Sequence, residues 1–201
     1  MQLNPKDKKR ITKFYHRRLE QYGIKGAMSL DWDTKENQLK RFEIFSKIGD
    51  LNGKKILDVG CGLGDLYGFL IKKYKGIDYC GIDIAPKMIA SARHKYPKAR
   101  FENKEATEIN EKFDYIFASG SLTFAVKQHK KYYLELIKKM YDLAKHGVAF
   151  NMLDQKVYRA NDLYLTYDPM KILEFCRTFA KDTKIITGYV EGDFTVYLYK
   201  K

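Results

Sequence analysis

The chain has 201 residues, of which 45% are hydrophobic and 31% charged, a composition typical of one soluble globular domain with a full-sized core. No run of about 18 apolar residues is present, so no membrane-spanning helix is expected. The N-terminus, MQLNPKDKKR, lacks the apolar segment of a secretory signal. Cys61, Cys80 and Cys176 are too widely spaced for a disulfide framework or a zinc site, so we expect no bound metal and a reducing, cytoplasmic location.

The net charge is strongly positive, at +13 from 38 basic and 25 acidic residues. Such a charge permits nucleic-acid binding. However, the basic residues are scattered, and their strongest cluster, residues 6–18, is interleaved with apolar residues at helical spacing. A lysine-rich surface on a soluble enzyme is therefore favoured over a nucleic-acid footprint.

The first 50 residues are predicted to be helical. Residues 6–22 form one apolar helix face, Gly23 ends that helix, and residues 24–33 form a loop. Asp33 and Glu36 then resemble a helix start, and the second helix runs to about Ile48. The apolar positions behind these assignments are Ile11, Phe14, Tyr15, Leu19 and Tyr22 in the first helix, and Leu39, Phe42, Phe45 and Ile48 in the second.

From Lys54 onward, strand and helix patterns alternate. Strands are expected at residues 54–60, 79–84, 100–106, 113–120 and 147–153, and helices at 65–74, 86–96, 130–144 and 169–181. KIITGYV and DFTVYLY close the chain as an antiparallel hairpin around Glu191–Gly192. This order predicts an α/β fold: an open sheet of about seven strands, mostly parallel, with helices on both faces. Residues 1–50 would form a helical cap on a main part at 51–201.

The stretch ILDVGCGLGD places Gly60, Gly62 and Gly64 directly after the first strand of the sheet. Open α/β sheets bind ligands at this position. A dinucleotide turn has the spacing GxGxxG, whereas Asp65 stands here in place of the third glycine and opposes a pyrophosphate. Asp58 adds a second negative charge, and no lysine follows to make a P-loop. The turn therefore favours a nucleoside without phosphates that carries a cationic group, such as S-adenosylmethionine.

With these residues the chain resembles the class I, Rossmann-like, S-adenosylmethionine-dependent methyltransferases. The run from Asp58 to Gly64 matches their acidic-x-Gly-x-Gly-x-Gly motif, and Asp83 follows about 20 residues later, where a carboxylate accepts both ribose hydroxyls. Glu105, before Ala106, departs from the family's usual Asp for the adenine amino group. The resemblance implies the cofactor-binding set Asp58, Gly60, Cys61, Gly62, Gly64, Asp83, Ile84, Met88, Glu105, Ala106 and Ser119.

Each of these landmarks alone has a structural explanation. Asp83 could cap a helix, and Met88 could be a core residue. The fourth landmark is the strand FDYIFAS at residues 113–119, which in the family ends beside the methionine portion of the cofactor. Four landmarks in the family's order, over about residues 51–153, are much harder to explain by structure alone. The resemblance therefore implies a methyltransferase that acts on an oxygen or nitrogen atom of a small-molecule acceptor.

The acceptor side is less specific in the sequence. His129 and Tyr15 are weak candidates for a general base, while His146 is expected at the end of the sheet away from the cofactor. The residues expected to bind the acceptor or form a lid are Tyr15, Tyr22, Trp32, Arg41 and Tyr164. Arg41 either binds a carboxylate or is a solvated helix residue. The loop at 154–167, with Tyr158, Arg159, Tyr164 and Tyr167, either encloses a small aromatic or anionic acceptor or is a packed surface loop.

Other functions remain open at this point. The basic charge would suit an RNA or protein methyltransferase, but Ala118-Ser119-Gly120-Ser121 lacks the Pro-Pro motif of adenine-amino enzymes, and no cysteine follows a proline. A non-catalytic subunit that binds the cofactor and stimulates a partner is a further alternative. A nicotinamide-dependent dehydrogenase is disfavoured by Asp65. The oligomeric state and the acceptor are not indicated.

Overall fold

A computed structural model describes residues 2–24, 27–31 and 34–200 of the chain. Its centre is one seven-stranded sheet with the strand order β3-β2-β1-β4-β5-β7-β6. The strands β3, β2, β1, β4 and β5 are parallel, and β7 pairs antiparallel with both β5 and β6. This confirms the predicted fold. The strands are β1 (Lys55–Val59), β2 (Asp78–Asp83), β3 (Arg100–Asn103), β4 (Phe113–Ala118), β5 (Ala144–Leu153), β6 (Asp182–Ile186) and β7 (Asp193–Tyr199).

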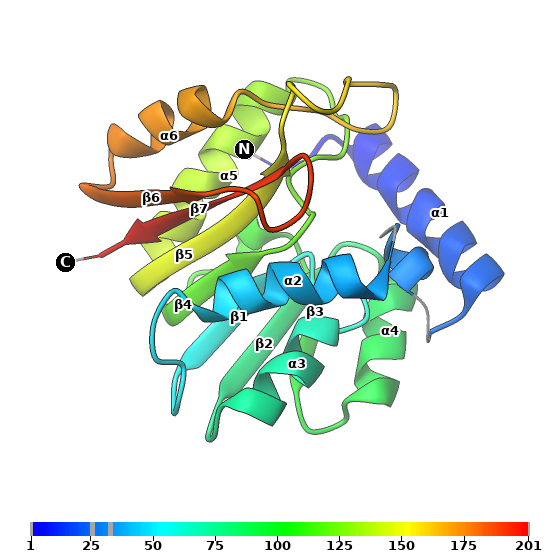
Figure 1. The fold of residues 1–201 in the computed structure, drawn as a ribbon. Coiled ribbons are helices and arrows are strands. Elements are labelled where there is room, and N and C mark those ends of the chain that lie inside the picture. The colour runs from blue at the N-terminus through cyan, green and yellow to red at the C-terminus, as the bar shows by residue number, and fades with distance from the viewer. Residues whose placement is uncertain (1, 25–26, 32–33, 201) are drawn as a thin grey trace.

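Helices cover both faces of the sheet (Figure 1). One face packs against α2 (Lys35–Ser46), α3 (Asp65–Lys73) and α4 (Pro86–Lys95), and the other against α5 (His129–Leu143) and α6 (Pro169–Arg177). Alternation along each strand divides the core accordingly. Phe117 faces the first layer, where its ring stacks on Phe45 of α2 at a centroid distance of 5.6 Å, whereas Ile116 and Ala118 face the second.

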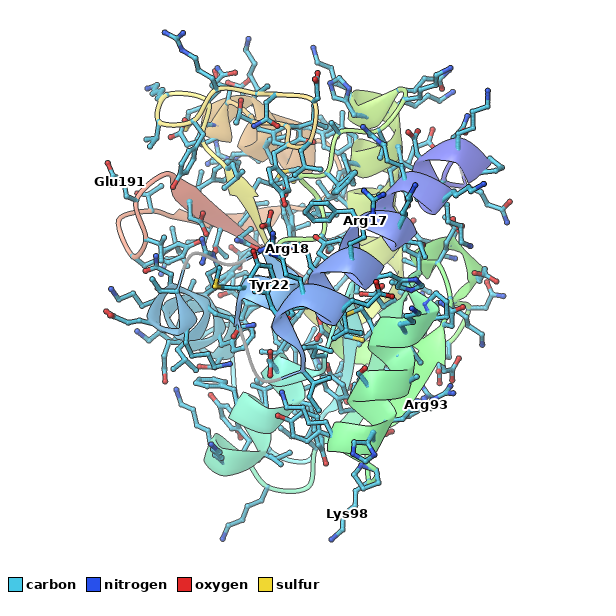
Figure 2. The ribbon with its side chains drawn as sticks, turned by 90° about the vertical axis from the view of Figure 1, so that its right-hand side faces the viewer. Arg17, Arg18, Tyr22, Arg93, Lys98 and Glu191 are labelled. Carbon is cyan, nitrogen blue, oxygen red and sulfur yellow. The ribbon has the colours of Figure 1, made fainter. Side chains whose placement is uncertain are left out.

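The first helix, α1 (Pro5–Tyr22), lies beside α4 rather than in either layer; Figure 2 faces it and labels Arg17, Arg18 and Tyr22. Its start is fixed by the Asn4 side chain, which accepts from the Lys6 N–H, and by Pro5 in the first turn. Gly23 ends it in a left-handed conformation (φ 67°) and donates its N–H to Leu19 O. A short 3₁₀ helix follows at Ala27–Leu30, and a second lies at Ala106–Glu108.

The start of α2 differs from the predicted Asp33–Glu36 pair. Thr34 is the N-cap, and its side chain accepts from the Asn37 N–H; Asp33 lies outside the described residues. Because α2 packs directly on the sheet through Phe45, it belongs to the same core as the strands. The division into residues 1–50 and 51–201 stays a prediction.

Two other boundaries differ from the sequence pattern. β5 begins at Ala144, three residues early, because its edge with β4 continues past a shift in register, so His146 lies inside the strand. α6 ends at Arg177 rather than at 181, since Thr178 caps it through a hydrogen bond to Phe175 O. None of the described helices is long and apolar enough to cross a membrane.

Candidate active site

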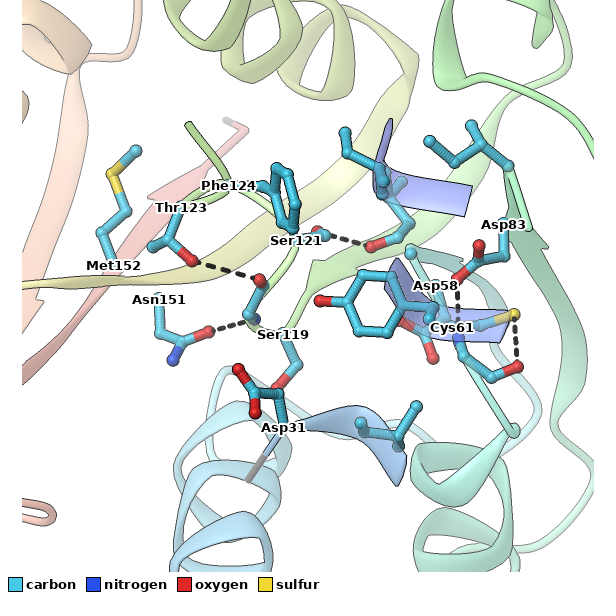
Figure 3. A pocket seen from close by; sticks show the side chains of 18 of the residues that line it. Asp31, Asp58, Cys61, Asp83, Ser119, Ser121, Thr123, Phe124, Asn151 and Met152 are labelled. Carbon is cyan, nitrogen blue, oxygen red and sulfur yellow. Dashed lines mark hydrogen bonds between the residues drawn. The ribbon is translucent and has the colours of Figure 1, made fainter. Parts of the chain in front are cut away.

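A pocket of about 350 Å³ lies at the carboxyl ends of β1, β2, β4 and β5 and is bordered by α1 and the 154–167 loop. Figure 3 shows it from close by, with Asp83 at one side and Asn151 and Met152 at the other. The structure brings most of the predicted site residues to this pocket: Asp58, Gly60, Cys61, Gly62, Asp83, Ile84, Met88, Glu105, Ala106, Ser119, Tyr15, Arg41 and Tyr164. Gly64, Tyr22 and His129 do not line it, and Trp32 lies outside the described residues.

The glycine turn needs glycine for two different reasons. Gly60 has φ 76°, and a Cβ there would collide with the Cβ of Ser121 from the loop after β4. Gly64 has φ 72° and leaves room for the ring of Phe101, without facing the pocket. The role of Gly64 is therefore to let the turn pass into α3, whereas Gly60 and Gly62 expose backbone to the pocket.

Asp83 fixes the turn from the neighbouring strand. Its Oδ2 accepts from the Gly62 N–H at 3.0 Å, and its Oδ1 accepts from the Ala85 N–H at 2.8 Å. Burial raises the pKa of this carboxyl group, and the backbone hydrogen bonds oppose the rise. Each oxygen accepts one backbone hydrogen bond and has a second lone pair available for a ligand hydroxyl.

Asp58 is a buried carboxyl group beneath the same turn. It is 2% exposed, and Tyr79 OH donates to its Oδ2 at 2.6 Å. Burial raises the pKa of Asp58 to about 7, and the nearby charges of Asp83 and Asp65 add to the rise, while the Tyr79 hydrogen bond lowers it. A cationic ligand group would relieve this desolvation, so the site favours a positive charge.

The charge of Asp65 is balanced, in contrast to the sequence-based argument. It begins α3 and lines the pocket, but Lys95 forms an ion pair with its Oδ1 and Gln38 Nε2 donates to its Oδ2 at 3.3 Å. Because Lys95 neutralises this carboxylate, Asp65 alone does not exclude a pyrophosphate. The remaining argument against a pyrophosphate is the charge of Asp58, which has no basic partner among the described residues.

Glu105 has partners that the sequence did not indicate. Its Oε2 accepts from the Leu3 N–H at 3.0 Å, and its Oε1 pairs with Lys8 Nζ at 2.8 Å. These contacts hold the N-terminal segment over the end of the pocket formed by Ile84 and Ala106. An adenine amino group at this position would share Glu105 with the N-terminus.

A buried polar network joins three elements behind the opposite end of the pocket. Arg41 Nε of α2 donates to Asp193 Oδ2, and Asn151 Nδ2 donates to the same oxygen at 3.1 Å. Asn151 Oδ1 in turn accepts from the Gly120 N–H at 2.8 Å. Sequence reasoning found Arg41 but missed Asp193 and Asn151, because each looks like an ordinary residue of a strand. Beside this network, Ser119 Oγ is buried without a hydrogen-bond partner in the described structure.

A second cluster of side chains borders the pocket where α1, the 3₁₀ helix and the 154–167 loop meet. Asp31, which has the unusual φ of 61°, accepts a hydrogen bond from Tyr164 OH and pairs with Arg18 at 2.8 Å. Tyr164 also forms a β-bridge with Phe124, and the Phe124 ring lies near Tyr15. The cluster thus connects α1, the 3₁₀ helix and the 154–167 loop. No sequence signal marked Asp31.

The two weak candidates for a general base have different positions. His129 is the first residue of α5 and lies outside the pocket, and no described histidine lines the pocket. Tyr15 does line it, but burial and the charge of Asp83 raise its pKa, which keeps the phenol protonated. His146 lies in the first half of β5, 3.7 Å from Asp114 Oδ1, away from the pocket. Tyr22 contacts Arg18 through a cation–π interaction instead.

Residues 56–147 match the family described as a methyltransferase domain, which spans the glycine turn, Asp83 and Glu105. This match, over a little less than half of the chain, agrees with the resemblance to the class I S-adenosylmethionine-dependent methyltransferases. Its fold is shared with magnesium protoporphyrin IX methyltransferase from Synechocystis PCC 6803, solved with bound S-adenosylmethionine, at a TM-score of 0.72 and 16% identity, with both chains covered completely.

Sequence relatives of the methyltransferase carry related names. Rv1506c of Mycobacterium tuberculosis, named as a methyltransferase, is 29% identical over 155 residues, which cover 72% of this chain and 92% of the relative. Malonyl-[acyl-carrier protein] O-methyltransferase 1 of Ilyobacter polytropus is 26% identical over 185 residues, which cover 87% of this chain. The alignment spans 63% of that second relative, less than two thirds of its length.

Proposed function

We propose that the methyltransferase transfers the methyl group of S-adenosylmethionine to an oxygen or nitrogen atom of a small-molecule acceptor. The observation that carries this proposal is the division of one pocket of about 350 Å³ into two chemically different ends. Asp58 and Asp83 lie on one side with the glycine turn, and Thr123, Asn151 and Met152 lie on the other, with the ring of Phe124 between them. Pockets of this size are typical of small ligands.

The carboxylate end fits the cofactor. Asp83 would accept the ribose hydroxyls, Ile84 and Met88 would pack against adenine beside Ala106, and Asp58 would balance the ammonium group. When bound, S-adenosylmethionine supplies a methyl group that its sulfonium already activates. The chain's own residues therefore have to align the acceptor and exclude water.

The acceptor would occupy the end near β4 and β5. Phe124 and Tyr133 line this end, and Tyr15 and Tyr164 cover it. These rings restrict the space to a compact molecule. The name of the Ilyobacter relative, an O-methyltransferase of a malonyl group, supports an oxygen atom as the methylated one.

The basic face of α1 is the observation behind the RNA alternative. Lys9, Lys13 and Arg17 border a shallow groove between α1 and Lys87 of α4. However, Ile11 and Tyr15 line the pocket from a different face of the same helix. A polymer bound in the groove would therefore lie on the far side of α1 from the methyl group. We place these lysines on the solvated surface.

Calorimetry and a transfer assay test the proposal together. We expect S-adenosylmethionine to bind with micromolar affinity and its methyl label to appear in small molecules. Binding of NAD in its place would contradict the cofactor assignment. Cofactor binding without transfer to any small molecule would favour a non-catalytic subunit, and labelled RNA with strongly salt-dependent binding would favour the polymer alternative.

A further inference from the structure

Charged side chains of both signs line the pocket. Asp58, Asp83 and Glu105 lie at the cofactor end, whereas the basic residues Arg41 and Arg159 line the pocket from α2 and from the 154–167 loop. The loop reaches the start of β7: Tyr158 OH donates to Glu191 O at 3.3 Å, two residues before Asp193. Arg159 therefore approaches the pocket from the side where Asp193 holds Arg41.

Most charges on the acceptor side are already balanced within the protein. Asp193 neutralises Arg41, and Arg18 neutralises Asp31. Arg159 is different, because it forms no ion pair with any residue that the structure describes. The acceptor end thus has an excess positive charge that an anionic molecule would complement.

The acceptor end of the pocket, away from Asp58, also offers no suitable group to remove a proton from an acceptor. None of the described lining residues is a histidine, and burial raises the pKa of Tyr15, Tyr132, Tyr133 and Cys61. Each carboxylate that lines the pocket already has a partner within the protein. Asp31 contacts Arg18 and Tyr164, Asp58 accepts from Tyr79, and Asp65 pairs with Lys95. Asp83 accepts from the N–H groups of Gly62 and Ala85, and Glu105 contacts Leu3 and Lys8. An amine or alcohol at neutral pH would have to lose a proton here.

We propose that the acceptor is a small organic acid, that its carboxylate oxygen is the nucleophile, and that Arg159 binds it. This inference rests on the proposed methyltransferase function and narrows it to one acceptor class. A carboxylate is ionised at neutral pH and needs no base. Its oxygen forms the new bond to the methyl carbon, the carbon–sulfur bond breaks, and that electron pair stays on sulfur. The products are a methyl ester and a thioether, and no proton is transferred.

The apolar lining of the pocket favours a reaction between a negative carboxylate and a positive sulfonium. A carboxylate and a sulfonium are converted into two neutral groups, so charge disappears along the reaction. Rings such as Phe124 and Tyr133 exclude water and lower the local dielectric, which strengthens attraction between the opposite charges. An amine acceptor would instead leave a cationic product beside Arg159, where it would be repelled.

The alkali lability of the product tests the acceptor class. The purified full chain is incubated with methyl-tritiated S-adenosylmethionine and the small-molecule fraction of a cell extract, supplemented with dicarboxylic acids of three to six carbons and with their matched amine, alcohol and phosphonate analogues. We expect the label to be released as volatile methanol by mild alkali, as from a carboxylic ester. Alkali-stable label, in an ether, amine or phosphonate ester, would overturn the carboxylate and leave the methyltransferase proposal standing. No labelled small molecule at all, with the cofactor bound, would refute both.

Substitution of Arg159 tests the binding role. With the best acid of the panel, Arg159→Gln should raise KM by about 10- to 100-fold, as expected for loss of a charged hydrogen bond. Arg159→Lys should keep most of the affinity, and Lys156→Gln, in the same loop but outside the pocket, should have no effect. Calorimetry should show the same loss of affinity when the acid is titrated into the complex of the protein with S-adenosylhomocysteine. The affinity for S-adenosylhomocysteine itself should be unchanged. An Arg159→Gln variant with unchanged KM would remove Arg159 from the acceptor subsite.

Discussion

The cofactor end and the acceptor end of the pocket are built in different ways. At the cofactor end, Asp83 and the Gly60–Gly62 backbone are joined by hydrogen bonds between adjacent parallel strands, as when Gly60 N–H donates to Ile82 O at 2.8 Å. At the acceptor end, the contacts join residues far apart in the chain: Tyr164 with Asp31 and Arg41 with Asp193, separated by 133 and 152 positions. The cofactor end is therefore held by the hydrogen bonds of the sheet itself, whereas the acceptor end is held by side-chain contacts between segments that pack on the sheet.

This difference indicates how the two ends will respond to change. Backbone hydrogen bonds within a sheet are shared among many residues, so the cofactor end depends on the fold as a whole. The acceptor end depends on single side-chain pairs, each of which can be removed alone. We expect substitutions at the acceptor end to separate acceptor binding from cofactor binding.

The largest effect is expected where the acceptor end meets the core. Arg41→Met leaves the fully buried side chain of Asp193 without its cation, so the free energy of unfolding should fall by about 3–5 kcal/mol. Lys40→Met removes only the exposed pair with Glu36 and should cost about 0.5 kcal/mol or less. Denaturant titration of both variants measures the difference. A loss below about 1 kcal/mol for Arg41→Met would show that the network is not a structural support.

Removal of the carboxylate at the end of β2 should have the next largest effect. Asp83→Ala should weaken S-adenosylmethionine by about 1.5–3 kcal/mol, because ribose hydroxyls lose a charged acceptor. Asp78→Ala, at the exposed start of the same strand, is the matched control and should bind normally. Calorimetry decides the matter, and equal affinity in the two variants would place the ribose elsewhere.

The pKa of Asp58 makes the cofactor end sensitive to pH. Its folded pKa of about 7 lies above the ordinary value of 3.8, so the folded state holds the proton more tightly than the unfolded state. The contribution of Asp58 to stability is therefore present below about pH 4 and is lost as the pH rises through 7. Cofactor affinity should change in the opposite direction, falling by up to about tenfold per pH unit below 7, because a protonated Asp58 cannot balance the ammonium.

Asp58→Asn should remove both the pH dependence of stability and the pH dependence of cofactor affinity. The variant without ligand should be more stable than the wild type at pH 8, since no buried charge remains, and it should bind S-adenosylmethionine more weakly there. Denaturation and calorimetry between pH 5.5 and 8.5 compare the two proteins. Parallel pH profiles for variant and wild type would exclude Asp58 as the titrating group.

The smallest effect is expected at the cover over the acceptor. Tyr164→Phe removes the hydrogen bond to Asp31 and should lower stability by about 1 kcal/mol. Tyr74→Phe removes a comparable hydrogen bond to Ser46 O, far from the pocket, and should cost about the same. Only Tyr164→Phe should raise the acceptor KM, by about fivefold, with the cofactor affinity unchanged. Equal KM values in the two variants would mean that Tyr164 is structural only.

The alternation of strands and helices was predictable because each segment carries its own apolar period, and the order of those segments leaves little choice of topology. The helix end at Gly23 and the glycine turn were equally local. The predicted boundaries of strands were wrong where a tertiary contact sets them, as at the start of β5, which extends along β4.

By itself, the sequence determined the sheet, the turn and the cofactor carboxylates, because residues within one βαβ unit meet at the same edge whatever the rest of the chain does. Only the tertiary structure decided that Lys95 neutralises Asp65, that Glu105 holds the N-terminus, that Asp31 meets Tyr164 and that His129 lies outside the pocket. The contacts of Glu105 and of Asp31 depend on how α1 and the 154–167 loop pack across the end of the sheet. No short-range pattern encodes that packing, because it is set by contacts between segments more than 100 residues apart.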